Sequence, residues 1–309
     1  MGKHAASRIV ILVACISSLA GVATAAAAAS CPQFLTERIP SRSPAAMTGS
    51  EFVGQTAALS EHEREGVIAA ELLAGDVPDF LRRLKPVTLR GRAAAGRTVE
   101  ITICVTPDYL ALGSDADFLR IPMGLRTAFA VAASFGFVLP TPKMVDAIYE
   151  QAEVRMRPEP LPPGPQMRSS AYYWEHQRRV QRQRLALHAP LGALMAGQKK
   201  DLVVTNRLWR KVGRVAIYGW HTGAGAPIQP LSTVHGARYA DYSHGVRLIS
   251  AVAYVDGRPR SIFDVLQDPW LAAIVSDEGP IIRPASLIEI APAPEQGHQA
   301  NGCTVTVAC

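Results

Sequence analysis

The side chains of this sequence that could transfer a proton or bind a metal are concentrated in one short segment, residues 221–244. The segment contains three of the eight histidines, His221, His235 and His244, together with Asp241. Glycines and prolines separate these residues, which is typical of an irregular loop held between regular elements. Because such loops commonly carry catalytic and binding groups, we expect the functional site here.

Metal-free acid–base catalysis is one chemistry that the segment could perform. A histidine titrates near neutral pH and transfers protons well when a carboxylate orients it. We expect His244 to be the base, Asp241 to orient it, and His235 to be a second acid–base group. The hydroxyl groups of Ser232, Ser243 or a tyrosine are candidate nucleophiles or acids, although the sequence lacks the Gly-x-Ser-x-Gly turn of serine hydrolases.

A catalytic metal centre is a second chemistry for the same residues. Zinc in hydrolases takes three protein ligands, usually histidine or carboxylate, and keeps one position for water. His235, Asp241 and His244 supply these ligand types, so zinc or another divalent metal would be the cofactor. Their spacing, His-x5-Asp-x2-His, matches no zinc motif that we recognise.

A third interpretation gives the segment a purely structural role. Tyrosine, histidine, aspartate and serine in loops rich in glycine and proline often hydrogen-bond to the backbone and hold the loop closed. Asp241 would then cap a turn, and Tyr239 and Tyr242 would pack on a sheet. The sequence leaves the three alternatives open.

Two predicted strands, residues 214–220 and 246–255, flank the segment and anchor its ends. If these strands are neighbours in a sheet, His221 and His244 lie within a few ångströms of each other. A lysine beside the site could attract a negatively charged substrate or stabilise an oxyanion. The residues expected to line a substrate pocket are His221, Trp220, Tyr239, Tyr242 and Lys200.

The N-terminus predicts export from the cytoplasm. Lys3 and Arg8 precede an apolar stretch at residues 9–22, and the alanine-rich run to Ala29 offers cleavage sites. We therefore expect residues 1–29 to be a signal peptide, the mature protein to be secreted or periplasmic, and no transmembrane helix to remain after cleavage. A lipid anchor on Cys31 is the less favoured alternative, because the position three residues before it lacks a large aliphatic side chain.

The cysteines also fit an exported protein. After cleavage the chain keeps four, and an even number in an oxidising compartment predicts two disulfides. One pairing joins Cys303 to Cys309 and Cys31 to Cys104. The alternative pairings connect both ends of the chain to the core.

The charge of the chain excludes one class of partner. The full sequence carries a net charge of +6, and loss of Lys3 and Arg8 with the leader leaves about +4. This mild excess allows attraction to anionic cell-wall polymers or membrane surfaces. It does not indicate a nucleic-acid-binding protein.

The order of predicted elements indicates an α+β fold, with a mainly antiparallel sheet flanked by helices. Strands and helices occur in separate groups rather than in regular alternation, which argues against a doubly wound parallel sheet. Ser60 and Glu63 form a capping box that opens a helix. The further predicted elements are a hairpin at 86–90 and 98–106, helices at 122–135, 141–154 and 169–188, strands at 202–209, 214–220 and 246–255, and a helix at 261–276 interrupted by Pro269.

A proline-rich stretch suggests how the chain is divided. Residues 157–168 are expected to be a spacer between an N-terminal lobe, 59–156, and a C-terminal lobe, 169–309, that carries the site. Residues 30–58 are expected to be a poorly ordered leader. The alternative is one continuous domain over residues 59–309.

Two functions from different classes follow. The first is an exported hydrolase that acts on a cell-wall or other extracellular polymer through the His/Asp site. The second is a non-enzymatic binding or envelope-interaction protein that uses the basic helix at 169–188 and exposed aromatic residues. The aromatic residues considered for such contacts are Trp174, Trp209, Trp220 and Trp270.

Overall fold

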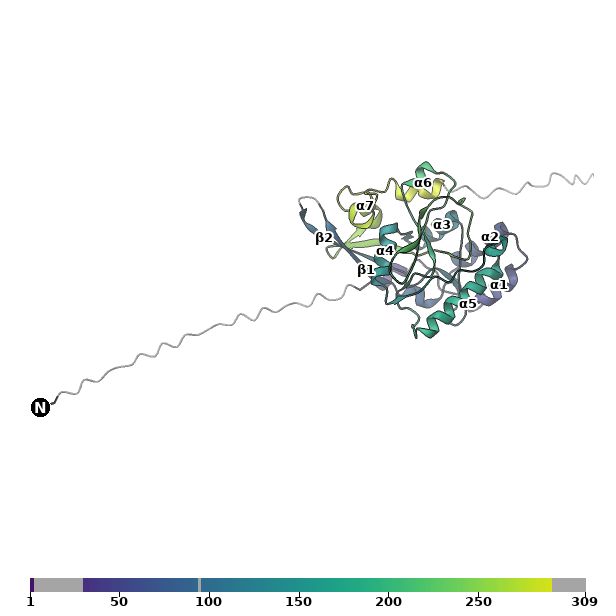
Figure 1. Ribbon diagram of the computed structural model, residues 1–309, viewed down its shortest axis with the longest axis horizontal. Helices are drawn as coiled ribbons and strands as arrows, with labels where there is room; N and C mark the ends of the chain where they lie inside the picture. The colour runs from purple at the N-terminus through teal and green to yellow at the C-terminus, as the bar shows by residue number, and fades with distance from the viewer. Residues whose placement is uncertain (3–29, 94–95, 291–309) are drawn as a thin grey trace, which may run out of the picture.

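Two β-sheets, built mainly from antiparallel strands, form the framework of the protein in the computed structural model (Figure 1). The structure describes residues 1–2, 30–93 and 96–290. The predicted signal peptide, residues 1–29, therefore falls almost entirely outside the described residues. The predicted pair Cys303–Cys309 also lies outside them.

The first sheet has the strand order β1-β2-β12-β13, and β5 pairs with β12. The predicted hairpin is confirmed, since β1 and β2 pair antiparallel from Lys85 opposite Val105 to Arg92 opposite Thr98. A two-residue turn joins β12 to β13, and both of its residues, Asp256 and Gly257, have the positive φ that such turns require. The strands are β1 (Lys85–Arg92), β2 (Thr98–Val105), β5 (Phe137–Val138), β12 (Ile249–Val255) and β13 (Arg258–Ser261).

The second sheet carries the segment of interest and has the order β10-β9-β8-β11. Its only parallel pair, among the described strands, is β11 with β8. Two smaller sheets pair β3 with β4 and β6 with β7. The strands are β3 (Ala111–Gly113), β4 (Phe118–Arg120), β6 (Val154–Arg155), β7 (Met195–Ala196), β8 (Lys200–Leu202), β9 (Ile217–His221), β10 (Pro227–Ser232) and β11 (His244–Gly245).

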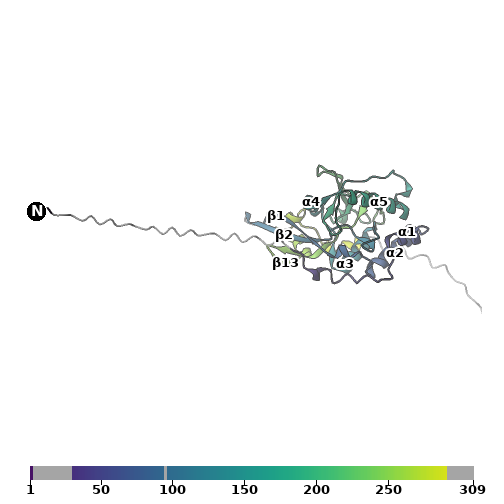
Figure 2. The ribbon, with the colours of Figure 1, turned by 90° about the horizontal axis from the view of Figure 1, so that it is seen from below.

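Helices cover the sheets, and together they confirm the α+β class with mainly antiparallel strands. In Figures 1 and 2, helices α1, α2 and α5 lie at the end of the molecule opposite to the β1–β2 hairpin. The predicted capping box is present: the Ser60 side chain accepts a hydrogen bond from the backbone N–H of Glu63, and the Glu63 side chain accepts one from the backbone N–H of Ser60. The helices are α1 (Gly49–Thr56), α2 (Glu61–Leu73), α3 (Leu125–Phe135), α4 (Pro142–Gln151), α5 (Ser170–Ala186), α6 (Arg207–Arg210), α7 (Ile262–Gln267) and α8 (Ala272–Val275), with 3-10 turns at Gln33–Thr36, Asp79–Arg82, Pro165–Arg168 and Pro284–Ile290.

Residues 30–58 are ordered, which corrects the prediction of a poorly ordered leader. They form a 3-10 turn and helix α1, whose N-cap Thr48 makes a second capping box with Glu51. Phe52 of α1 is fully buried. A disulfide joins Cys31 to Cys104, as one of the predicted pairings proposed. The apolar contacts and the disulfide outweigh the turn-rich composition of this region.

The proline-rich stretch does not separate two sheets. Strand β12, which follows it, pairs with β2, which precedes it. The stretch itself packs into the fold, because Leu161 is buried and its backbone bonds to Tyr242. One hydrophobic core contains residues from both predicted lobes, which favours the continuous alternative.

In the part of the chain that the structure describes, no helix combines the length and the apolar character needed to span a bilayer.

The Cys31–Cys104 disulfide predicts a large loss of stability when it is removed. It closes a loop of 73 residues, for which the loss of unfolded-state entropy corresponds to about 4 kcal/mol. We expect Cys31→Ser to lower the free energy of unfolding by roughly 2–4 kcal/mol in urea denaturation. Reduced parent protein should match the variant. Equal stability of oxidised parent and variant would show that the cross-link contributes nothing.

Candidate functional site

The pairing of β8 with its neighbours brings the first part of the site together. In the parallel pair β8–β11, Lys200 lies beside His244. On the other side of β8, Lys200 pairs with Gly219 of β9, directly before Trp220. The side chains of successive strand residues point to opposite faces of the sheet, so the side chains of Lys200 and Asp201 lie on different faces. Lys200 and His244 thus share one face.

Asp241 is the centre of this face. Its carboxylate is buried, and one oxygen, Oδ1, accepts from the backbone N–H of Ser243 at 2.8 Å and from the Ser243 hydroxyl at 2.6 Å. The other oxygen, Oδ2, accepts from the Tyr239 hydroxyl at 3.1 Å and lies 4.0 Å from Nε2 of His244. Burial raises the pKa of Asp241, but His244 and the Ser243 hydrogen bonds outweigh it and leave the pKa below its ordinary value. The carboxylate is therefore a fixed negative charge.

His244 is buried against this carboxylate. Its side chain has no exposed surface, and neither ring nitrogen has a hydrogen-bond partner among the described residues. Burial lowers the pKa of His244, and this effect exceeds the opposing influence of Asp241. The ring is therefore neutral at neutral pH, and a substrate in solution cannot touch it in this conformation.

His235 is the accessible imidazole of the site. Its ring stacks on Tyr239 with 4.1 Å between the ring centroids and only 9° between the planes. The guanidinium carbon of Arg168 also lies over the Tyr239 ring, 5.5 Å from its centroid. Partial burial lowers the pKa of His235, against the influence of Asp241, and the nearby Lys200 and Arg214 lower it further. His235 is thus a neutral base at pH 7, with a defined orientation.

Trp220 supports Lys200 in a strained backbone conformation. The Lys200 ammonium lies 4.9 Å from the centroid of the indole ring. Trp220 has φ of 57°, a left-handed value that is costly for a bulky residue and that persists only where the surrounding structure enforces it. The indole is only 8% exposed, so Trp220 positions Lys200 rather than presenting a stacking surface to a substrate.

Six of the predicted site residues are therefore neighbours, but His221 is not among them. Strand β8 lies between β9 and β11, which places His221 and His244 two strand spacings apart, roughly 10 Å. The prediction that neighbouring strands join these two histidines is wrong. The six residues that the structure brings together are Lys200, Trp220, His235, Tyr239, Asp241 and His244.

Tyr242 also lies apart from the predicted pocket. Its hydroxyl accepts from the backbone N–H of Leu161 and donates to the carbonyl of the same residue, at 2.8 and 3.2 Å. The carbonyl of Tyr242 accepts from the buried ammonium of Lys199. Tyr242 therefore connects the proline-rich stretch to the core.

His221 belongs to a second polar cluster, on the opposite face of the sheet. Its Nε2 lies 2.8 Å from Oδ1 of Asp146 on α4, and the Tyr149 ring stacks on the imidazole at 4.4 Å. The Tyr218 hydroxyl donates to the same carboxylate. His221 also borders a small enclosed cavity with Asp201. Sequence reasoning missed Asp146, because a lone aspartate on an amphipathic helix resembles a solvated surface residue.

Asp201 is the buried acid of this second cluster. Its Oδ2 accepts from the Tyr109 hydroxyl at 2.8 Å, and Arg247 borders the same small cavity. Burial raises the pKa of Asp201 to about 6, although Arg247 and Tyr109 oppose this effect. Asp201, His221 and Arg247 thus line the same small cavity.

Unsatisfied polar atoms occur in both clusters and near them. In the described part of the chain, eight buried side-chain nitrogen or oxygen atoms lack a hydrogen-bond partner, and one of the eight belongs to Asp76. Buried polar groups are normally paired, and exceptions require an explanation such as function. The other seven atoms belong to His176, Gln198, Trp220, His244 and Arg247.

The geometry does not favour the metal interpretation. Among the residues that the structure describes, no three histidine, cysteine, aspartate or glutamate side chains are arranged to hold a metal ion. His235 faces the ring of Tyr239, and the hydroxyl of this tyrosine occupies one oxygen of Asp241. The metal-free alternative therefore has the stronger structural basis.

No protein-family model, curated protein or solved structure matches this chain.

The buried carboxyl of Asp201 predicts a pH dependence of stability. Its folded pKa, about 6, lies above the ordinary value of 3.8, so the folded state holds this proton more tightly than the unfolded state. Stability must then fall as pH rises from about 4 to about 6. We expect Asp201→Asn, relative to the parent, to gain roughly 1–3 kcal/mol in free energy of unfolding between pH 4 and pH 7.

Urea denaturation of both proteins at the two pH values measures this difference, because the two proteins have every other titratable residue in common. Asp264→Asn, at an exposed carboxylate, is the matched control for the change of one carboxylate to an amide. A difference between parent and Asp201→Asn that stays constant with pH would contradict the assignment.

Proposed function

We propose that the protein is a hydrolase with a metal-free acid–base site on the Lys200 face of the second sheet. One observation carries the proposal. The buried carboxylate of Asp241 fixes the hydroxyl of Tyr239, and the ring of Tyr239 orients the accessible imidazole of His235. Such a series of fixed contacts behind one reachable base is what acid–base catalysis requires.

The roles of the two histidines follow from their exposure. His235 is partly exposed and neutral, so it can accept a proton from a water molecule. His244 is fully buried, and it lies 5.6 Å from the Tyr239 ring and 6.3 Å from the His235 ring. We therefore assign the base to His235 and a positioning role to His244, which reverses the order favoured by the sequence.

The proposed reaction is a one-base hydrolysis. His235 removes a proton from water as the water oxygen bonds to the electrophilic atom of the substrate. Lys200 stabilises the negative charge that develops there. The bond to the leaving group then breaks, and the leaving group takes the proton that His235 received. The imidazole returns to its neutral form, and one water molecule is consumed.

An extracellular polymer is the proposed substrate class. This step depends on the predicted signal peptide and is consistent with the Cys31–Cys104 disulfide, since disulfides persist in oxidising compartments. Lys200, Arg168 and Arg214 lie near the base or the Tyr239 ring that supports it, so the site disfavours positively charged substrates.

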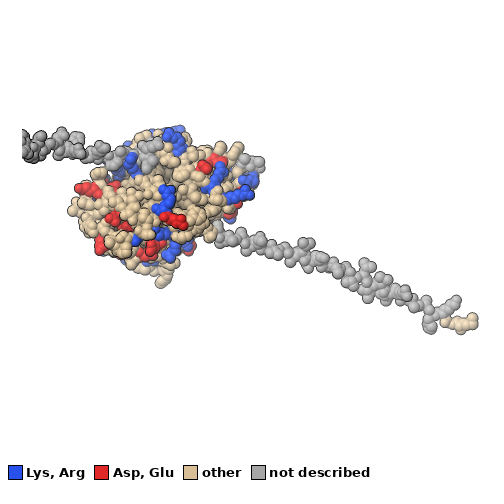
Figure 3. All heavy atoms as spheres, turned by 180° about the vertical axis from the view of Figure 1, so that it is seen from behind, with Lys and Arg blue, Asp and Glu red and all other residues tan. Residues whose placement is uncertain are grey.

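The alternative of a non-enzymatic binding protein has less support. On α5, Arg178 and Arg179 both pair with Glu175, so their charges are partly compensated within the helix. Basic and acidic side chains are interspersed over the face of the molecule in Figure 3. Of the four tryptophans, Trp220 is buried, Trp174 and Trp209 are partly buried against the core, and Trp270 alone is strongly exposed.

Substitution of the base tests the proposal. We expect His235→Gln to lower kcat at least 100-fold, the usual contribution of a general base, without loss of stability. Tyr239→Phe keeps the stacked ring and loses the bond to Asp241, so we expect an intermediate loss, of about tenfold. His188→Asn, at an exposed histidine elsewhere, is the control.

The assay is incubation of mature protein with purified cell-wall glycans and peptides in water labelled with heavy oxygen, followed by mass spectrometry. Incorporation of the label into a product shows hydrolysis. Full activity of His235→Gln would exclude the assigned base, and absence of any labelled product from these polymers would count against the substrate class.

The pH profile supplies a separate test. Because its surroundings lower the pKa of His235 from 6.5, kcat/KM should rise with pH and reach half its maximum below pH 6.5. The rise of kcat/KM with pH should disappear in His235→Gln. In Lys200→Gln its midpoint should move toward pH 6.5, because this variant removes a positive charge that lowers the pKa of His235. An activity that increases only above pH 8 would point to a different base.

A further inference from the structure

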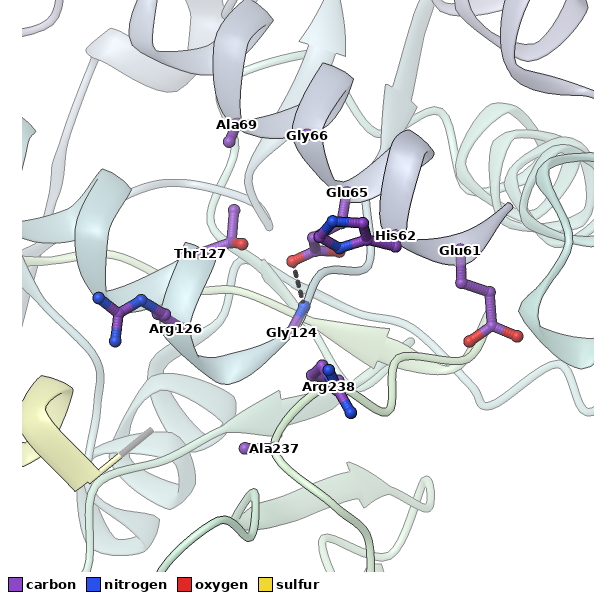
Figure 4. Close-up of a pocket in the computed structure, with 10 residues that line it drawn as sticks. All are labelled: Glu61, His62, Glu65, Gly66, Ala69, Gly124, Arg126, Thr127, Ala237 and Arg238. Atoms are coloured by element: carbon purple, nitrogen blue, oxygen red, sulfur yellow. Dashed lines mark hydrogen bonds between the residues drawn. The ribbon is translucent and has the colours of Figure 1, made fainter. Parts of the chain in front are cut away.

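A cavity of about 320 Å³ lies between α2, the start of α3 and residues 237–238 (Figure 4). Most of its wall surface is apolar, and four of the residues that line it have no side chain larger than a methyl group. Polar side chains surround these small residues, and Figure 4 shows Glu65 directed from α2 toward the backbone of the α3 start. The four small residues are Gly66, Ala69, Gly124 and Ala237.

The cavity adjoins the proposed catalytic site. Glu61, at its rim, forms an ion pair with Arg168 at 3.0 Å, and this arginine lies over the Tyr239 ring. Ala237 and Arg238, which line the cavity, directly precede Tyr239 in the chain. A ligand in the cavity would therefore lie beside the residues that lead to Tyr239 and His235.

The cavity walls select a neutral ligand with a hydrogen-bond donor. Oε1 of Glu65 accepts from the backbone N–H of Gly124 at 2.7 Å, and the Thr127 hydroxyl lies beside the same carboxyl. Burial raises the pKa of Glu65. Acidic and basic side chains both line the cavity, Glu61 and Glu65 with Arg126 and Arg238, so the lining has no excess of one charge that would select a charged ligand. An amide satisfies these conditions, since its N–H can donate to Glu65 and its methyl group can occupy the small apolar floor.

The backbone of the walls argues against a peptide ligand. Extended peptides bind by pairing with an open strand edge. Here most of the lining belongs to α2 and α3, whose backbone groups are largely bonded within the helices. The rim instead carries side chains that can donate or accept hydrogen bonds, namely Glu61, His62 and Arg126. Such side chains suit the hydroxyl groups of a sugar ring. The volume lies at the lower end of ligand pockets, the size of a single unit.

We propose that this cavity is a subsite for the acetamido group of an N-acetylated sugar unit in a polysaccharide. The inference rests on the proposed function in one respect, that the sugar belongs to the hydrolysed polymer. Binding itself does not require catalysis, so the two proposals can fail separately.

Gly66 provides a substitution that fills the cavity without disturbing the fold. A Cβ at Gly66 would meet no heavy atom within 4 Å, and the residue lies inside a regular helix. Leucine there should project into the open space and favour the helix over glycine. Gly54 of α1 has the same open surroundings outside the cavity, so Gly54→Leu is a matched control.

The experiment is titration calorimetry of the mature protein with two tetrasaccharides. One is made of N-acetylglucosamine and the other of glucose in the same linkage, so that they differ in the acetamido group. We expect the N-acetylated sugar to bind at least tenfold more tightly than the glucose sugar. Gly66→Leu should lose this binding by at least tenfold, whereas Gly54→Leu and His235→Gln should keep it.

Three results would overturn the proposal: equal binding of the two sugars, undiminished binding by Gly66→Leu, or tighter binding of an N-acetylated dipeptide than of the N-acetylated sugar. Loss of hydrolysis in His235→Gln with binding intact supports both the subsite and the assigned base. Retained binding by a parent protein that hydrolyses none of the polymers would count against the proposed substrate class of the hydrolase and leave the subsite standing.

Discussion

The burial of the Asp241 charge is the constraint on which the site depends. A carboxylate removed from water is stable only when hydrogen bonds and opposite charges compensate it. Here Ser243 supplies two donors, Tyr239 supplies a third, and Lys200 lies close enough to influence its pKa. Ser243 and Tyr239 lie in different parts of the segment 221–244, and Lys200 lies on β8. Compensation of the Asp241 charge therefore also determines the path of this segment and the orientation of the Tyr239 ring, which stacks on His235.

Much of the local structure could be predicted from the sequence, because its causes are local. The capping box of Ser60 and Glu63, the hairpin of β1 and β2, and the helix break at Pro269 each depend on residues close together in the chain. The ordering of residues 30–58 could not be predicted in this way. It depends on the burial of Phe52 and on a disulfide to a residue 73 positions away.

The sequence predicted that chemically active side chains gather in residues 221–244, but not how they are arranged. Their composition alone drew attention to Asp241, His235 and Tyr239, which lie together on the Lys200 face of the second sheet. The position of His221 depends on strand order, since β8 comes between the strands expected to be neighbours. It also depends on left-handed backbone at Gly219 and Trp220, which interrupts the alternation of β9. Exposure, which distinguishes His235 from His244, is likewise a property of the folded chain.

The disulfide described above has a consequence for the closure of the first sheet. It joins Cys31 to Cys104, whereas β2 pairs with β12, a strand some 150 residues later in the chain. The connection between β2 and β12 is therefore as long in the oxidised chain as in the reduced chain. Its closure carries the same entropic cost in both, and pairing of distant strands is slow. Oxidation thus holds the N-terminal segment on β2 without shortening the closure of the sheet.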